Sequence, residues 1–228
     1  MKELIICPPS EKQKLFLTAD TKHIAFGGAR GGGKSWSVRT KAKLLALRYG
    51  GIKILIVRRT YPELIHNHIN QLLEELNGIA RYNKSEKVFT FPNGSTINFG
   101  YCNADKDLNQ YQGSEYDVIF LDEATQLQEM WIKKITACVR GVNDFPKRIY
   151  YTCNPGGASH GYIKRLFIDH KYEEGENPED YTFIQSLVTD NKVLYRDYML
   201  TSQLLFQMRF SWLHRDHISM YSSVGVGV

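Results

Sequence analysis

Short apolar runs along this chain alternate with longer segments in which apolar residues recur at helical spacing. Residues 52–57 form a run rich in β-branched side chains, and residues 118–121 form a second run without a polar position. Such runs are typical of strands that are buried on both faces of a parallel sheet. Further strands are predicted at residues 22–26, 148–152 and 181–188.

Four helices are predicted between these strands. In residues 62–76, apolar side chains recur three and four positions apart, and Asn77 with Gly78 gives an end signal. The other three helices are predicted at residues 33–49, 127–139 and 159–168. The alternation of strand and helix favours an α/β fold with a mainly parallel sheet, and right-handed crossovers place helices on both faces of that sheet.

A β-hairpin is predicted as an insertion at about residues 87–99. Apolar and polar residues alternate at 87–91 and again at 95–99. The sequence between them is Pro92-Asn93-Gly94, which is typical of a turn. Alternation on both sides of such a turn is a strong hairpin signal.

A glycine-rich loop follows the first predicted strand and opens the first predicted helix. It reads Gly28-Ala29-Arg30-Gly31-Gly32-Gly33-Lys34-Ser35 and fits the pattern GxxxxGK[ST] at every fixed position. The glycines allow backbone N–H groups to surround a phosphate, Lys34 can reach the β- and γ-phosphates of ATP, and the Ser35 hydroxyl can bind Mg²⁺. The alternative is a plain glycine-rich turn, but the strand before the loop and the helix after it favour nucleotide binding.

Two acidic residues follow the predicted strand 118–121. Asp122 is the candidate that holds Mg²⁺ through the water shell of the ion, and Glu123 is the candidate general base that polarises the attacking water. Taken alone, two acids after a strand also fit a solvated turn. Together with the phosphate-binding loop they predict ATP hydrolysis. The glutamate beside the aspartate favours the strand-inserted, RecA-like branch of P-loop NTPases.

Three further positions are candidate parts of the same site. Thr152 ends the strand 148–152 and Asn154 follows it, so they would sense the γ-phosphate, or else belong to a simple Asn-Pro-Gly turn. Gln13 can read the edge of adenine with one donor and one acceptor, although a plain surface glutamine is the alternative.

Hydrolysis also needs a positive charge near the transition state. Arg30, inside the loop, is the candidate in cis. The alternatives are Arg58, Arg59, Arg140 and an arginine from a neighbouring subunit. The candidate catalytic residues are therefore Lys34, Glu123 and Arg30.

The composition is that of an ordinary globular protein. Of 228 residues, 43% are hydrophobic and 23% are charged, which excludes a disordered chain. No apolar run approaches the roughly 18 residues of a membrane span, and the N-terminal apolar stretch is too short for a signal peptide. The four scattered cysteines form no CxxC pair, so we expect free thiols and a cytosolic protein. His214 and His217 have no neighbouring partners that would make a metal site.

Basic residues are unevenly distributed along the chain. The net charge is +5, and residues 21–62 contain no Asp or Glu. This segment suits an anionic partner, which means nucleotide phosphates and, as an extension, a nucleic-acid backbone. For residues 39–48 the alternatives are a DNA-binding surface and a solvated basic helix face.

Five motifs in this order resemble the large subunit of bacteriophage terminases, the motors that package DNA into capsids. They are residues 26–35, residues 56–64, residues 112–117 with 120–124, Thr152-Cys153-Asn154-Pro155, and Gln13. The resemblance covers about residues 8–199. It implies that Gln13 reads adenine and that Thr152 and Asn154 belong to the coupling motif of that family.

The resemblance also implies a function. The expected protein is an ATPase motor that couples hydrolysis of ATP, with Mg²⁺, to translocation of double-stranded DNA into a procapsid. Its implied partners are the DNA, a portal protein and a small terminase subunit, and it would form a homo-oligomeric ring on the portal, in the host cell cytoplasm and away from any membrane. The alternatives are a helicase-like, nucleic-acid-stimulated ATPase and a nucleotide-binding remnant without turnover.

Two features depart from the family pattern. Gln112 stands where many relatives have an arginine, which puts a trans-acting arginine at this position in doubt. Residues 1–199 are expected to form the ATPase domain and residues 200–228 an atypical tail. The nuclease domain of the family is not expected in this chain, and neither is DNA cleavage by it.

Overall fold

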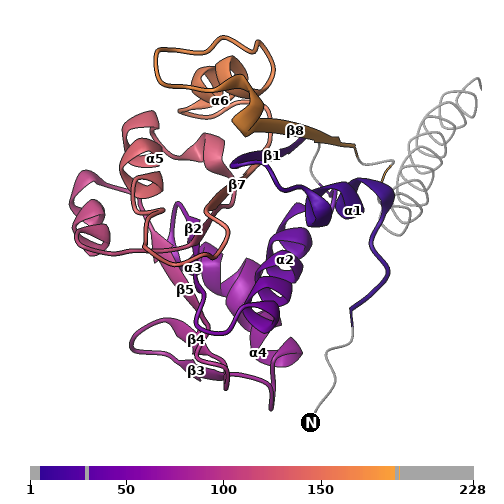
Figure 1. The fold of residues 1–228 in the computed structure, drawn as a ribbon, viewed down its shortest axis with the longest axis vertical. Helices are drawn as coiled ribbons and strands as arrows, with labels where there is room; N and C mark the ends of the chain where they lie inside the picture. Colours follow the sequence, from indigo (N-terminus) through magenta and orange to yellow (C-terminus); the bar gives the residue numbers. More distant parts are fainter. Residues whose placement is uncertain (1–5, 29–30, 188–189, 191–228) are drawn as a thin grey trace, which may run out of the picture.

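The computed structural model describes residues 6–28, 31–187 and 190, and it places the strands of this part in one sheet. The order across the sheet is β3-β4-β5-β2-β6-β7-β1-β8 (Figure 1). The strands are β1 (His23–Gly28), β2 (Lys53–Arg58), β3 (Arg81–Asn83), β4 (Val88–Thr90), β5 (Thr96–Tyr101), β6 (Val118–Leu121), β7 (Arg148–Cys153) and β8 (Tyr181–Ser186). Every predicted strand is confirmed, whereas β3 was not predicted.

Six neighbouring strands of this sheet are parallel. They are β5, β2, β6, β7, β1 and β8, and β4 and β3 extend the sheet antiparallel from β5. The predicted hairpin is present as β4 and β5, and β5 also pairs with β2 in parallel. β6 and β7 lie between β1 and β2 although they come later in the chain. This arrangement confirms the predicted strand-inserted type.

Alternate residues of the central strands supply two separate hydrophobic cores. Ile54 and Ile56 of β2 belong to one core, whereas Leu55 and Val57 belong to the other. The same alternation holds along β1, β6 and β7. Because both faces of these strands are covered, nearly every position is apolar, which is the origin of the runs in the sequence.

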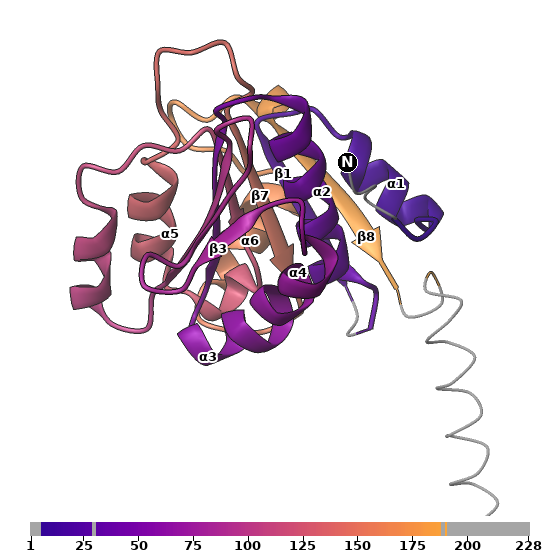
Figure 2. The same cartoon turned by 90° about the horizontal axis from the view of Figure 1, so that it is seen from below.

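Helices cover both faces of the sheet, as predicted (Figure 2). One face carries α1 (Glu11–Thr18), α2 (Lys34–Arg48) and a helical segment made of α3 (Tyr61–Leu64), η1 (Ile65–Ile69) and α4 (Asn70–Glu75). The other face carries η2 (Asp105–Tyr111), η3 (Ala124–Gln126), α5 (Glu129–Thr136) and α6 (His160–Phe167), and η4 (Pro178–Asp180) precedes β8. Among the described residues, the helices are too short or too polar to cross a bilayer.

Several helical elements differ from the expectation. The predicted helix at 62–76 is present but is interrupted by the π-helical turn η1. η2 was not predicted, and neither was α1. The capping box of α1 consists of two hydrogen bonds, in which the Ser10 hydroxyl accepts from the Gln13 N–H and Gln13 Oε1 accepts from the Ser10 N–H. The tail at 200–228, with His214 and His217, lies outside the described residues.

The cysteines have the predicted state. All four are free thiols, and Cys102, Cys138 and Cys153 are buried while Cys7 is exposed.

Lys41 and Lys43 of α2 are buried, so both interpretations of residues 39–48 are wrong for these two lysines, whereas Arg48 is exposed and neither interpretation is contradicted for it. Lys41 donates to the carbonyl of Leu17 in α1 and lies 5.7 Å from the centre of the Tyr150 ring. Lys43 forms an ion pair with Glu75 of α4. The Arg39 guanidinium is also largely buried and reaches the segment that holds α4. These cations attach α2 to its neighbouring helices.

Lys41→Met should remove the gain in stability that wild type shows as pH rises through the titration range of Lys41. Burial, followed by repulsion from Arg148 and Arg48, lowers the pKa of Lys41 from 10.5 to about 8. The unfolded chain therefore binds more protons between these values, and wild type gains about 3 kcal/mol as pH rises through this window. Urea unfolding at pH 7.5 and 9.5 should show a smaller gain for the methionine variant.

The exposed Lys106 offers a matched control for this measurement. Lys106→Met should keep the wild-type slope of stability against pH. An equal slope in wild type, Lys41→Met and Lys106→Met would contradict the buried-lysine explanation.

Candidate nucleotide-binding site

The glycine-rich loop lies between the end of β1 and the start of α2. A Cβ at Gly28 would lie 1.9 Å from the carbonyl oxygen of Ser186 in β8, so only glycine fits there. Gly33, at φ 71°, is left-handed and precedes the first helical residue, Lys34. The Ser186 hydroxyl donates to the Gly32 carbonyl at 3.2 Å, which ties the loop to β8. Ala29 and Arg30 lie outside the described residues.

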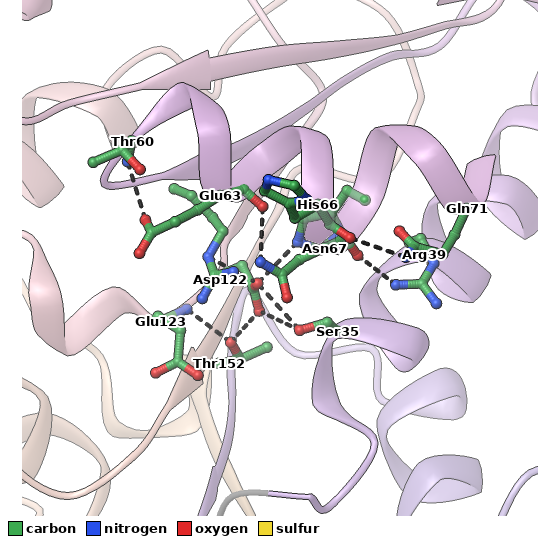
Figure 3. A network of polar contacts seen from close by, with 12 residues as sticks. Ser35, Arg39, Thr60, Glu63, His66, Asn67, Gln71, Asp122, Glu123 and Thr152 are labelled. Atoms are coloured by element: carbon green, nitrogen blue, oxygen red, sulfur yellow. Dashed lines mark hydrogen bonds and ion pairs between the residues drawn. The ribbon is translucent and has the colours of Figure 1, made fainter. Parts of the chain in front are cut away.

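Asp122 directly follows β6 and is fully buried among polar groups (Figure 3). One carboxylate oxygen accepts from the Thr152 hydroxyl, and the other lies 2.8 Å from His68 Nε2. The Ser35 hydroxyl donates to Oδ2 at 3.2 Å, and Arg58 Nε lies 3.4 Å from the same oxygen. The loop after β1 and the acidic end of β6 therefore meet directly.

The surroundings of Asp122 keep it ionised. Burial alone would raise its pKa, but the contacts with His68, Arg58 and Thr152 outweigh burial and hold the pKa well below its usual range. A carboxylate that stays charged at every physiological pH is suited to binding a cation.

Glu123 has the opposite character. Its backbone is left-handed, at φ 57° and ψ 47°, which costs a non-glycine residue about 1–3 kcal/mol and is most common at functional sites. Burial and the nearby charge of Asp122 raise the pKa of Glu123, against the attraction of Lys34, Arg58 and Asn154. Neighbouring acids with pKa values shifted in opposite directions are typical of a site that divides two roles between them.

Asn154 joins Glu123 to the phosphate loop. Its amide nitrogen lies 2.7 Å from each carboxylate oxygen of Glu123. Its amide oxygen accepts from Lys34 Nζ at 2.9 Å. Thr152 adds a second link, because it accepts from the Glu123 N–H at 2.9 Å while its hydroxyl donates to Asp122. The end of β7 thus contacts both acids and the loop lysine.

An open cavity of about 480 Å³ adjoins this network. Lys34, Ser35, Glu123 and Asn154 line it, and Arg58 is part of the same wall. Burial lowers the pKa of Lys34, against the attraction of Glu123, Cys153 and Asp122. The cavity combines cationic side chains and the glycine-rich loop with the carboxylate of Glu123, and the buried carboxylate of Asp122 adjoins it through its contact with Ser35. This combination suits a magnesium-bound polyphosphate.

The remaining sequence candidates lie in different places. Gln13 is beside the loop, with Nε2 3.5 Å from the Gly33 carbonyl, but its amide oxygen is engaged in capping α1. Arg59 and Arg140 are exposed and bond to Asn103 and Glu115 respectively. Neither arginine is among the described residues that line the cavity.

Sequence reasoning missed His68. It lies four residues after Leu64 and four before Leu72, which are both buried. This spacing places His68 on the apolar face of the helix. A buried polar side chain needs a partner, and this spacing was the available signal. The partner, Asp122, is too distant in sequence to be inferred.

The sheet order, the loop after β1 and the acids after β6 define a P-loop NTPase of the strand-inserted class. A family model described as phage terminase large subunit matches residues 20–206, so the chain belongs to this family. Among curated protein sequences, no significant match is found.

Solved structures of large terminases share the fold. The large terminase of a thermophilic bacteriophage has a TM-score of 0.67 at 19% identity, over 81% of this chain and 47% of that one. Its complex with ATP-γ-S has a TM-score of 0.62 at 19% identity, over 81% of this chain and 46% of that one. The ATPase domain of the Thermus phage P74-26 large terminase has a TM-score of 0.62 at 15% identity, over 86% and 88%. The present chain thus spans about half the length of the first of these terminases.

Proposed function

We propose that this chain binds and hydrolyses ATP as the motor domain of a phage terminase large subunit. The observation that carries the proposal is the single hydrogen-bonded network that joins Lys34 and Ser35 of the phosphate loop to Asp122 and Glu123. Membership of the terminase family, and the ATP-γ-S complex of a large terminase with the same fold, support it.

Residues of the loop would bind the phosphates. They are Gly28, Ala29, Arg30, Gly31, Gly32, Gly33, Lys34 and Ser35. Lys34 would exchange its present partner, Asn154, for the β- and γ-phosphates. Gln13 would read the adenine edge, which its position beside the loop supports, provided that the amide leaves its capping contact. Arg30 would supply positive charge in cis, and Arg58, which lines the cavity as Arg39 also does, would assist it.

The oxygen donors present fit Mg²⁺. Ser35 and Asp122 present a hydroxyl and an ionised carboxylate 3.2 Å apart, and Mg²⁺ prefers such oxygen ligands. The described residues contain no cluster of three His, Cys, Asp or Glu side chains, so the ion would share its shell with phosphates and water. When bound, Mg²⁺ neutralises charge that develops on the phosphates.

Glu123 would act as the general base. Its raised pKa and its position in the cavity suit the removal of a proton from the attacking water. Thr152 and Asn154 would form the sensor, because an incoming phosphate that draws Lys34 away removes one of the two contacts of the amide that orients Glu123.

The wider role is part of the same proposal. The motor would translocate double-stranded DNA into a procapsid, as a homo-oligomeric ring with a portal protein and a small terminase subunit, in the host cell cytoplasm. Residues 1–199 would form the ATPase domain. The buried Lys41 and Lys43 are not candidates for the DNA contact.

Steady-state ATP hydrolysis with and without double-stranded DNA tests this function. Magnesium-dependent turnover that DNA stimulates, without strand separation, is the expected result. Strand separation would instead indicate a helicase-like ATPase. Tight ATP binding without turnover, even with a portal protein present, would indicate a remnant that only binds nucleotide.

Asn154→Ala should lower kcat by about 10- to 100-fold with little change in the affinity for ATP. The alanine removes the two hydrogen bonds that orient the Glu123 carboxylate, and small misplacements of a reacting group have effects of this size. Initial rates over a range of ATP concentrations separate kcat from KM. An unchanged kcat would exclude Asn154 as a sensor or orienting residue.

A further inference from the structure

His68, which belongs to none of the sequence motifs described above, contacts Asp122 at the end of β6. His68 and Asp122 are both fully buried, and His68 Nε2 lies 2.8 Å from Asp122 Oδ2. The neighbouring Asn67 uses its carbonyl to accept from Arg39 of α2 at 2.6 Å. The consecutive residues Asn67 and His68 thus connect η1 to two places, α2 and the end of β6.

The backbone around His68 is unusual. Residues Ile65–Ile69 form a π-helical turn inside an otherwise α-helical segment, and such turns are rare and most often found at functional sites. The Asn67 side chain donates to the Glu63 carbonyl at 2.8 Å and so satisfies a carbonyl in this region. The Asn67 and His66 side chains lie close to this network in Figure 3 and line the nucleotide cavity.

His68 makes its polar contact through one ring nitrogen, Nε2. An ionised carboxylate only accepts hydrogen bonds, so Nε2 carries a hydrogen and donates to Asp122. The other ring nitrogen, Nδ1, is buried and has no hydrogen-bond partner among the described residues. The ring therefore contributes one hydrogen bond to the site, and its acceptor is the candidate magnesium ligand.

The contact restricts how Asp122 can turn. Thr152 donates to Oδ1 and His68 donates to Oδ2, so the two oxygens are held separately. The Ser35 hydroxyl approaches the same carboxylate at 3.2 Å. Outer hydrogen bonds of this kind fix the orientation of a metal ligand, and their removal typically weakens metal binding by about 10- to 100-fold.

We propose that His68 is a positioning residue that orients Asp122 for Mg²⁺. It does not touch the phosphates or the metal itself, and it acts through the carboxylate alone. The inference rests on the proposed function, in which Asp122 and Ser35 bind the magnesium ion of the nucleotide.

Two variants of similar length separate positioning from packing. His68→Gln places an amide nitrogen where Nε2 lies, whereas His68→Met fills similar space without a donor. Binding of Mn²⁺ in the presence of ADP, followed by electron paramagnetic resonance, reports on the metal without turnover. We expect the methionine variant to bind Mn²⁺ about 10- to 100-fold more weakly, the glutamine variant to stay near wild type, and all three proteins to bind ADP equally in EDTA.

The outcomes distinguish this inference from the function on which it rests. Thermal unfolding first verifies that each variant is folded, and His68→Asn, a donor too short to reach Oδ2, replaces the methionine variant if that one does not fold. Equal Mn²⁺ affinity in the donor and non-donor variants would overturn the positioning role. Absence of nucleotide-dependent Mn²⁺ binding in wild type would overturn the proposed site itself.

Discussion

Glu123→Gln should stop ATP turnover and leave nucleotide binding intact. Glutamine has the same shape and can still accept from the Asn154 amide, which now lies 2.7 Å from both carboxylate oxygens. It has no carboxylate to take the proton of the attacking water, so kcat should fall by about 100- to 10,000-fold. Single-turnover hydrolysis and the affinity for a fluorescent ATP analogue, measured on the same preparation, check both parts.

The same substitution at an exposed acid is the control. Glu129→Gln on α5 removes one negative charge from the surface, at a residue that does not line the cavity among those described. It should hydrolyse ATP at the wild-type rate. Hydrolysis by Glu123→Gln at that same rate would show that the base is another group, and the left-handed backbone at Glu123 would then need a different explanation.

The central strands could be predicted because their environment is uniform. Residues 54–57 and 118–121 are buried on both faces, so the sequence itself carries the signal of a parallel sheet. The loop from Gly28 to Ser35 and the adjacent acids Asp122 and Glu123 are also local in sequence. The strand-inserted type of sheet could be predicted because a glutamate beside the aspartate is typical of the strand-inserted branch of P-loop NTPases.

Contacts between distant segments could not be predicted in the same way. Lys41 and Lys43 are indistinguishable in sequence from solvated lysines, and their partners, the Leu17 carbonyl and Glu75, belong to other helices. In α1, the apolar residues 15–17 are consecutive, and only Phe16 is buried, so no helical period marks the element. Burial of a cation depends on which helices pack together, and that is a property of the tertiary fold.

The division of roles between the two acids also arises only in the folded chain. Asp122 and Glu123 are neighbours in sequence, yet donors from three distant elements lower the pKa of the first. Burial and the charge of Asp122 raise the pKa of the second. A carboxylate that stays ionised next to one that binds a proton more readily is the arrangement that metal binding and general-base catalysis require together.

Lys34→Ala should severely weaken ATP binding. In the structure Lys34 donates to Asn154 Oδ1 from a buried position at the start of α2, and the phosphates would take over this ammonium group. Loss of a charged hydrogen-bond donor costs about 1.5–3 kcal/mol, which corresponds to a 10- to 100-fold weaker affinity. Isothermal titration with ATP and Mg²⁺ gives the affinity directly.

Lys53→Ala removes an exposed lysine at the start of β2 and should bind ATP like wild type. Because alanine at residue 34 also leaves Asn154 without its lysine partner, the amide would stay on Glu123 whether or not nucleotide is present. In this variant the hydrogen bonding of the Glu123 carboxylate should therefore not change when nucleotide binds. Its hydrolysis rate should stay low even at saturating ATP. Wild-type affinity in Lys34→Ala would mean that phosphates do not displace the lysine from Asn154, and the proposed sensor would lose its basis.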